Sequence, residues 1–228
     1  METPIKNIAV FIPGRLYRNS TQYDFSFLKT MKDFYNSHYI NVYFFASLST
    51  ECDIPFITTE LINLLEISNE QLNRESVICP SIIYNFPKRP ETNYENTYKM
   101  FYHNYKCFYL IQQYSKKYNI NFDVLIKWRT DIDIIDEQSF LQDSLKHFST
   151  FSDNTNKIYV PGQDLFWGMS DQLAYGNYYC MNKYCTTIAN IISLCKLGYV
   201  YHPETLLGAQ CFTNDIFIDT FNISYKLF

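Results

Sequence analysis

The fold is decided by the stretch FDVLIKWRTDID, at residues 122–133. It begins as an apolar run suited to a buried strand and ends in Arg129, Asp131 and Asp133. In an extended chain, residues two positions apart share a face, so the two carboxylates would project the same way, with Cα atoms roughly 6.5 Å apart at about 3.3 Å of rise per residue. Two like charges so placed repel each other unless a positive charge lies between them. The simplest such charge is a divalent metal ion, so the stretch predicts a metal site just past a strand.

The segments before this stretch alternate between strand and helix patterns. We expect strands at 5–12, 40–48 and 76–83, and helices at 24–36, 60–65 and 92–119. This β-α-β order predicts a parallel sheet covered by helices. Ligands of such sheets bind beyond the carboxyl ends of the strands, which is where the acidic end of 122–133 would lie.

The order of elements changes after Asp133. We expect a helix at 137–148 capped by Asp136, strands at 157–160 and 165–169, a loop at 170–176 that opens a helix at 177–197, a helix beginning at 202–207, and a terminal strand or tail. The residues therefore predict an α/β chain with a βαβ half followed by a mixed half. A length of 228 residues, 47% of them apolar, is enough for one large domain or two intimate halves.

Composition narrows the class of protein. The formal charge is −4 and no basic block occurs, which argues against a nucleic-acid partner. The seven cysteines include no CxxC pair, so we expect free, mostly buried thiols in a reducing compartment rather than a zinc site. No stretch approaches the ~20 apolar residues of a membrane span, and the first residues lack the apolar run of a signal peptide. We therefore expect a cytoplasmic protein without a membrane span.

Two groups of residues are candidates for binding phosphate. Gly14, in the Pro13-Gly14-Arg15 turn that ends the first strand, allows a close backbone approach to a ligand, and Arg15 adds positive charge. The same turn is equally compatible with an ordinary strand-to-loop connection. Arg129 either pairs with Asp131 structurally or grips a phosphate with two hydrogen bonds.

The second half of the chain supplies further candidates. Asp171 is either the N-cap of a helix, worth about 1 kcal/mol, or a general base or anchor for an acceptor hydroxyl. His202 is either a metal ligand or phosphate donor, or a structural residue before a proline.

Asp164 is a weaker candidate of the same kind as Asp171, and Glu204 lies in a first helical turn, where the helix dipole favours a carboxylate whatever its function. Trp167 and Tyr175 either stack on a sugar or a base or pack in the core.

Three segments together resemble a known family. They are VLIKWRTDID at 124–133, SDQLAYG at 170–176 and HPETLL at 202–207. In this order they look like the motifs of GT-A-type glycosyltransferases found in bacterial surface-polysaccharide loci and in large DNA viruses. The family often has an Arg-Gly turn after its first strand, whereas here Gly14 precedes Arg15.

The resemblance implies a GT-A-like, Rossmann-like fold with a mixed, mainly parallel sheet flanked by helices. It implies a nucleoside-diphosphate sugar donor, bound by Pro13, Gly14, Arg15, Arg129 and Asp131, and a glycan or glycoprotein acceptor. Mn²⁺ or Mg²⁺ would bridge the diphosphate, with Asp131, Asp133 and His202 as ligands, and Asp171 would be the catalytic residue. Residues 1–135 would form the donor half and 136–228 the acceptor half of a single domain, in the host cytoplasm if the protein is viral.

Two other functions fit the same residues. A Mg²⁺-dependent nucleotidyl- or phosphoryl-transferase also uses paired carboxylates, although no glycine-rich phosphate loop with a Lys occurs among the six glycines. A non-catalytic glycan-binding module of the same fold is the third possibility, and the intact Arg129, Asp131 and Asp133 argue against it. The sequence does not decide between inversion and retention at the sugar carbon.

Overall fold

The computed structural model describes residues 5–14, 26–49, 68–72, 76–129, 131–151, 155–162 and 168–227, with 68–72 described by its backbone alone. The expected helix at 60–65, most of the expected strand at 165–169, and the candidates Arg15, Asp164 and Trp167 lie outside these ranges. In the described part of the chain, no helix has the length and apolar character needed to cross a membrane.

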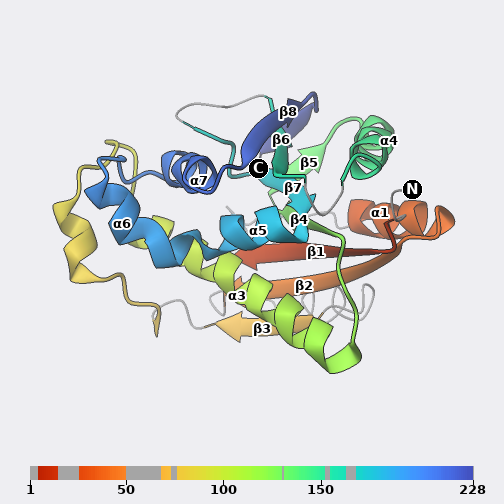
Figure 1. Cartoon of the computed structure of the whole chain (residues 1–228), viewed down its shortest axis with the longest axis horizontal. Helices are drawn as coiled ribbons and strands as arrows, with labels where there is room; N and C mark the ends of the chain where they lie inside the picture. The colour runs from red at the N-terminus through yellow and green to blue at the C-terminus, as the bar shows by residue number, and fades with distance from the viewer. Residues whose placement is uncertain are drawn as a thin grey trace.

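A seven-stranded sheet in the order β3-β2-β1-β4-β7-β6-β8 forms the centre of the molecule. Figure 1 shows the strands in this order, from β8 at the top to β3 at the bottom. The strands are β1 (Asn7–Gly14), β2 (Asn41–Ser49), β3 (Ser68–Leu72), β4 (Val124–Trp128), β6 (Lys157–Pro161), β7 (Leu173–Asn177) and β8 (Phe217–Phe221). Only β7 is antiparallel to its two neighbours, β4 and β6, and the other four pairings are parallel. The expected α/β class with a mixed, mainly parallel sheet is confirmed.

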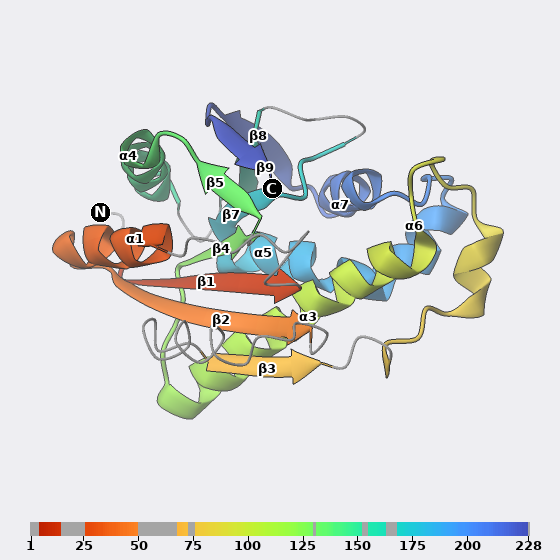
Figure 2. The ribbon, with the colours of Figure 1, turned by 180° about the vertical axis from the view of Figure 1, so that it is seen from behind.

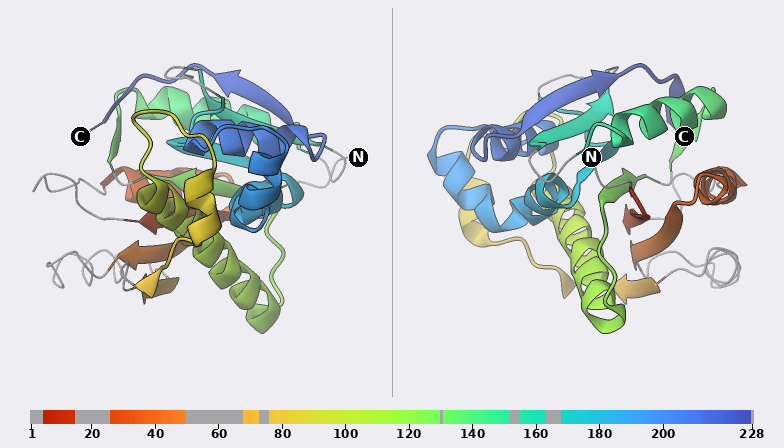
Figure 3. Two further views of the ribbon diagram at one scale, coloured as in Figure 1. Left: turned by 90° about the vertical axis from the view of Figure 1, so that its left-hand side faces the viewer. Right: turned by 45° about the vertical axis from the view of Figure 1, so that its right-hand side comes forward.

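Two helical layers cover the sheet. The helices are α1 (Ser26–Ser37), α3 (Tyr94–Tyr118), α4 (Glu137–Phe148), α5 (Tyr178–Cys185), α6 (Ile191–Lys196) and α7 (Pro203–Phe212), with 3-10 turns η2 (Ser81–Asn85) and η3 (Thr186–Asn190). One core cluster joins α1 and α4 to one face of the sheet, and a second joins α3, α5, α6 and α7 to the other. Figure 3 shows α1 and α3 on opposite sides of the strands.

The side chains of β1 alternate between the two faces of the sheet, and residues 8–13 are buried on both. Ile8, Val10 and Ile12 belong to the α1 side, whereas Ala9 and Phe11 belong to the α3 side. A strand buried on both faces explains why this segment is a continuous apolar run.

Helix ends follow the expected signals. The side chain of Asp136 accepts a hydrogen bond from Ser139 N (3.0 Å) and caps α4. Asn119 ends α3 in the left-handed conformation, with φ of 52°. These ends were predictable because capping depends on residues within one turn of the helix.

Several elements differ from the expectation. Residues 76–83 form no strand; instead, the 3-10 turn η2 follows Pro80. Residues 173–177 form β7 rather than the loop before a helix, and the expected helix at 177–197 is divided into α5, η3 and α6. β3 was not expected.

The stretch 122–133 is also not a single extended run. β4 ends at Trp128, and Asp131 lies in a turn. The chain then forms β5 (Ile132–Ile134), which pairs with β9 (Tyr225–Leu227) in a separate two-stranded sheet (Figure 2).

Candidate functional site

The candidate site lies where the order of the sheet reverses. From β1 the chain builds β2 and β3 on one side, and then returns to place β4 on the other side of β1. In open α/β sheets, ligands bind outside the carboxyl ends of the strands at such a switch point. β1 ends here with Gly14 and β4 ends here immediately before Arg129.

Gly14 is suited to a ligand-facing turn. Its φ is 103°, a left-handed conformation that glycine adopts at little cost. No described atom lies within 4 Å of the position that a Cβ would take. The parallel pairing of Phe11 with Lys127 carries Gly14 to the same edge of the sheet as Arg129. Pro13 and Gly14 are thus at the predicted place, without a contact that assigns them a ligand.

Arg129 lies between two carboxylates. Its Nε donates to Asp131 Oδ1 (2.7 Å) and its Nη2 donates to Asp131 Oδ2 (2.5 Å). Its Nη1 is 3.6 Å from Asp171 Oδ1. Burial would lower the pKa of Arg129, but the charge of Asp171 and the hydrogen bonds and charge of Asp131 outweigh it and raise that pKa. The predicted pairing of Arg129 with Asp131 is confirmed, and Asp171 joins it from a distant part of the sequence.

β7 brings Asp171 to this place. β7 runs antiparallel to β4, with Trp128 opposite Leu173, so the residues just before β7 meet the end of β4. The predicted N-cap role of Asp171 is wrong, because a strand follows it and the N-cap of α5 is Asn177. Residues 170–176 were expected to form a loop that opens a helix, whereas pairing with β4 and β6 makes residues 173–177 a strand.

Lys127 is a site residue that the sequence did not indicate. Its side chain is completely buried, and its Nζ donates to the backbone carbonyl of Asp171 and to the hydroxyl of Tyr184 (3.2 Å). Lys127 and Arg129 are two positions apart, so both reach the Asp171 segment from β4. The only available signal was the charge itself, a lone Lys inside an apolar strand run.

Lys127, Arg129, Asp131 and Asp171 form a charged cluster, and its positive and negative charges are equal in number. Lys127 and Arg129 carry two positive charges, and Asp131 and Asp171 carry two negative ones. Partly buried charges are tolerated when they are paired and hydrogen-bonded in this way. Burial lowers the pKa of Lys127 to about 8, while the charges of Asp171, Asp131 and Cys185 oppose this effect and that of Arg129 adds to it.

Replacement of Lys127 by Met should change how stability depends on pH. The pKa of Lys127 is about 8 in the folded protein, against an ordinary 10.5, so between these values the unfolded chain binds the additional proton. Wild type should therefore gain stability relative to Lys127→Met as pH rises from about 8 to about 10.5, with a full difference of roughly 3 kcal/mol. Urea unfolding of both proteins in a reductant measures it. A difference between the two proteins in the free energy of unfolding that does not change with pH would contradict the assigned pKa of Lys127.

The two aspartates of the predicted pair are not equivalent. Asp131 is 5% exposed and both of its oxygens accept hydrogen bonds from Arg129. Asp133 is exposed on β5, where it lies opposite Lys226 of β9. The expectation that both lie on one extended strand is wrong, because β4 ends at Trp128, Asp131 lies in a turn and Asp133 lies in β5.

The carboxylates of Asp131 and Asp133 are chemically suited to a hard cation, but the structure does not place them together in a metal-binding arrangement. Carboxylate oxygens are the preferred ligands of Mg²⁺ and Mn²⁺. Asp133 presents an exposed carboxylate, whereas Asp131 is held by Arg129. Within the described ranges, no three His, Cys, Asp or Glu side chains gather in a metal-binding arrangement. The metal roles of Asp131, Asp133 and His202 therefore remain predictions.

His202 precedes α7 and borders the cluster. Its Nε2 is 3.8 Å from Glu91 Oε1, and its Nδ1 has no hydrogen-bond partner among the described residues. Burial lowers the pKa of His202, and the charges of Glu91 and Asp171 oppose this shift. The weaker candidates Tyr175 and Glu204 are both buried, Tyr175 within the aromatic core of the α1 side.

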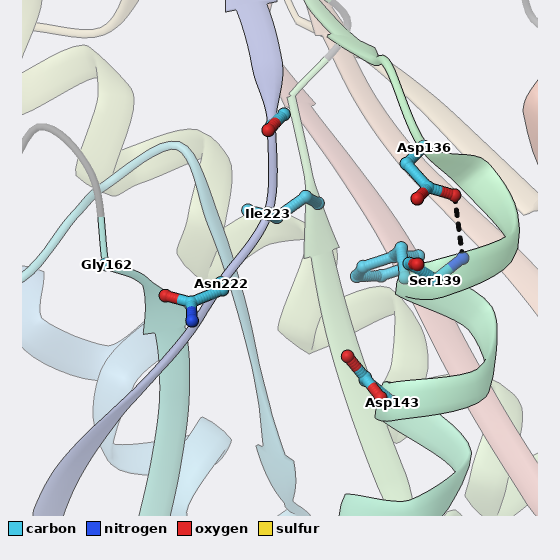
Figure 4. Close-up of a pocket in the computed structure, with 8 residues that line it drawn as sticks. Asp136, Ser139, Asp143, Gly162, Asn222 and Ile223 are labelled. Carbon is cyan, nitrogen blue, oxygen red and sulfur yellow. Dashed lines mark hydrogen bonds between the residues drawn. The ribbon is translucent and has the colours of Figure 1, made fainter.

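Two pockets lie near this region. The α4 pocket, of about 560 Å³, is lined by Asp136, Ser139, Phe140, Asp143, Gly162, Asn222, Ile223 and Ser224. Figure 4 shows Asp136 and Asp143 on α4, facing the segment with Asn222 and Ile223. The α3 pocket, of about 430 Å³, is lined by Tyr84, Lys88, Pro90, Glu91, Thr92, Asn93, Tyr94 and Glu95. The α3 pocket includes Glu91, which lies beside the predicted site residue His202.

Comparison with known proteins gives likenesses of structure alone. No protein-family model matches the sequence, and no curated protein sequence is detectably similar to it. Mouse xyloside xylosyltransferase 1 is similar over 95% of this chain and 85% of its own, with 5% identity and a TM-score of 0.47. The inositol-1-phosphate CTP transferase of T. maritima is similar over 100% and 91%, with 9% identity and a TM-score of 0.46. A glycosyltransferase involved in glycosylation of the major capsid of PBCV-1 is similar over 94% and 82%, with 10% identity and a TM-score of 0.41. At these identities and TM-scores, the likenesses assign neither an activity nor a substrate to this chain.

Proposed function

We propose that this protein is a metal-dependent glycosyltransferase that moves a sugar from a nucleoside-diphosphate sugar to a glycan or glycoprotein acceptor. The observation that carries the proposal is the position of Arg129, between Asp131 and Asp171 at the carboxyl end of β4. This arrangement brings together a guanidinium that would bind phosphate, a carboxylate that would hold a hard cation and a second carboxylate that would meet a hydroxyl, at the switch point of the sheet.

Arg129 would bind the diphosphate of the donor. A guanidinium pairs with two phosphate oxygens as readily as with a carboxylate, because both acceptors match its planar fork. Gly14 would let the phosphates approach the backbone at the end of β1. Pro13 and Arg15 belong to the same proposed donor site.

Mn²⁺ or Mg²⁺ would be held by Asp133, with Asp131 and His202 as further proposed ligands. When bound, the ion would neutralise the charge that develops on the departing diphosphate. Asp131 also keeps Arg129 in place, so its two roles are linked.

Asp171 would meet the acceptor hydroxyl. In an inverting reaction its carboxylate takes the hydroxyl proton while the oxygen bonds to the sugar carbon, and the bond from that carbon to the phosphate oxygen breaks, releasing nucleoside diphosphate. In a retaining reaction Asp171 would orient the hydroxyl. Arg129 Nη1, 3.6 Å away, and Lys127, which binds the Asp171 carbonyl, fix the position of this carboxylate in either case.

The proposal includes a cytoplasmic location, in the host if the protein is viral. The six cysteines in the described part of the chain are free and buried, which suits a reducing compartment.

Calorimetry and product analysis test the proposal. Titration with UDP- and GDP-sugars should give binding that Mn²⁺ strengthens, and Asp131→Asn should weaken it about tenfold or more, as expected for loss of a charge-assisted contact. The matched control is Asp143→Asn, which removes an exposed carboxylate paired with Lys146 on α4 and should change nothing. The product should be nucleoside diphosphate.

Other results identify the alternatives. Release of pyrophosphate would indicate a nucleotidyltransferase. Saccharide binding without metal-dependent nucleotide binding would indicate a glycan-binding module and contradict the proposal.

A further inference from the structure

The α3 pocket lies beyond the carboxyl ends of β1 and β2. It lies where η2 leads into the N-terminus of α3, and Figure 1 places this segment past the arrowheads of β1 and β2. Its volume of about 430 Å³ is within the usual range of small-molecule sites. It is therefore on the side of the sheet where the candidate site opens.

The pocket is fixed to the segment that carries His202. Tyr201 N donates to Pro87 O (2.8 Å), and Tyr201 Oη donates to Tyr94 O (2.9 Å). Glu91, which lines the pocket, is 3.8 Å from His202 Nε2. The charge of Asp171 opposes the lowering of the pKa of His202 by burial. Two hydrogen bonds and the Glu91–His202 approach therefore join the pocket wall to the segment that carries His202.

Two buried polar atoms at this wall lack hydrogen bonds. Thr92 is 6% exposed and His202 is 8% exposed. Neither Thr92 Oγ1 nor His202 Nδ1 has a hydrogen-bond partner among the described residues. Buried polar atoms are nearly always paired in folded proteins, so the unpaired Oγ1 of Thr92, a residue that lines the pocket, suits a ligand with hydroxyl or similar groups. His202 does not line the pocket but lies next to Glu91, which does.

The lining selects the class of ligand. Glu91 and Glu95 outnumber the one cation, Lys88, which disfavours phosphates and other anions. The exposed ring of Tyr84 is held beside Tyr94, with ring centroids 5.2 Å apart, and its hydroxyl donates to Glu95 (3.1 Å). An aromatic face beside carboxylates suits a molecule that has both an apolar C–H face and many hydroxyl groups, which describes a sugar.

We propose that the α3 pocket is the acceptor subsite, which binds a neutral sugar unit of the acceptor and directs its hydroxyl toward His202 and Asp171. This inference rests on the proposed function, because it assumes that Asp171 receives the acceptor. It adds the position and the chemical class of the acceptor.

The test separates acceptor use from donor chemistry. Wild type, Tyr84→Ala and Glu91→Gln are compared for hydrolysis of the donor by water and for transfer to a panel of methyl glycosides, with direct binding of the glycosides followed by saturation-transfer NMR. Tyr109→Ala is the matched control, since Tyr109 is an exposed tyrosine of α3 outside the pocket. Asp143→Asn tests the α4 pocket in the same way.

Both pocket variants should raise the KM for the glycoside about tenfold and weaken its NMR signal, as expected for one lost hydrogen bond or stacking contact. Hydrolysis of the donor should stay within about twofold of wild type in Tyr84→Ala, because Tyr84 contacts none of the proposed donor or metal residues. Glu91→Gln is judged by glycoside binding and KM alone, because Glu91 lies 3.8 Å from the proposed metal ligand His202. Three results would overturn the inference. They are unchanged use of the glycoside by both pocket variants, loss of its use only in Asp143→Asn, and no use of it by wild type. If wild type hydrolyses no donor, the proposed function itself fails, which is a distinguishable result.

Discussion

Asp171→Asn should lower the rate of nucleoside diphosphate release about 10²- to 10⁴-fold, the usual contribution of a positioned acid or base. The amide has nearly the same shape as the carboxylate but cannot take a proton. Arg129 keeps its two hydrogen bonds to Asp131, so the cluster should stay folded. Donor affinity should change little, because the lost contact serves the acceptor.

Stopped assays with saturating donor and acceptor measure this effect, and calorimetry measures donor affinity. Asp143→Asn on α4 is the matched control and should retain full activity. An Asp171→Asn protein with the wild-type rate would exclude Asp171 as the catalytic residue. A protein that has lost donor binding in the same proportion would instead place Asp171 in the donor site.

Gly168→Ala should be the most destabilising single substitution near the site. A Cβ at Gly168 would lie 2.2 Å from the backbone oxygen of Glu204 and 2.6 Å from its carbonyl carbon. Neither atom belongs to a flexible side chain, so the Asp171 segment or the first turn of α7 must move. We expect a loss of about 2–3 kcal/mol in the free energy of unfolding, as for other overpacked contacts, together with a loss of activity.

Gly208→Ala is the control for this experiment. Gly208 lies within α7, and a Cβ there would meet its nearest atoms at 3.7 and 3.8 Å, an ordinary contact distance. Alanine is favoured over glycine inside a helix by up to about 1 kcal/mol, so this variant should be as stable as wild type or slightly more stable. Urea unfolding compares the two variants. Equal stability of Gly168→Ala and wild type would show that the close approach to Glu204 is not maintained.

Three strands and two helices of the first half were predictable because their signals are local, whereas β3 and the 3-10 turn η2 were not predicted. The apolar runs of β1, β2 and β4, the apolar spacing of α1 and α3, and caps such as Asp136 all depend on residues close together in the sequence. β7 was not predictable in this way. Its residues include Leu, Ala and Gly, and they are extended because β4 and β6 pair with them on both sides. The separate sheet of β5 and β9 joins residues from opposite ends of the second half, which no local pattern reveals.

The part of the candidate site that depends on neighbouring residues was predictable, and the part that depends on long-range strand pairing was not. Asp131 lies two residues after Arg129, so their pairing could be expected from spacing. Asp171 was chosen as a candidate, but its approach to Arg129 depends on the antiparallel pairing of β7. Lys127 was missed because a strand pattern predicts burial without indicating what a buried ammonium group will meet. Asp133 was expected beside Asp131, and the turn at Asp131 separates their environments.

The most direct test of the central claim is a crystal structure of the protein with Mn²⁺ and a nucleoside diphosphate. The account predicts the diphosphate at the carboxyl ends of β1 and β4, with its oxygens on Arg129 and the ion between the phosphates and Asp133 or Asp131. A diphosphate bound elsewhere, such as in the α4 pocket, or one that contacts neither Arg129 nor an ion held by these aspartates, would contradict it.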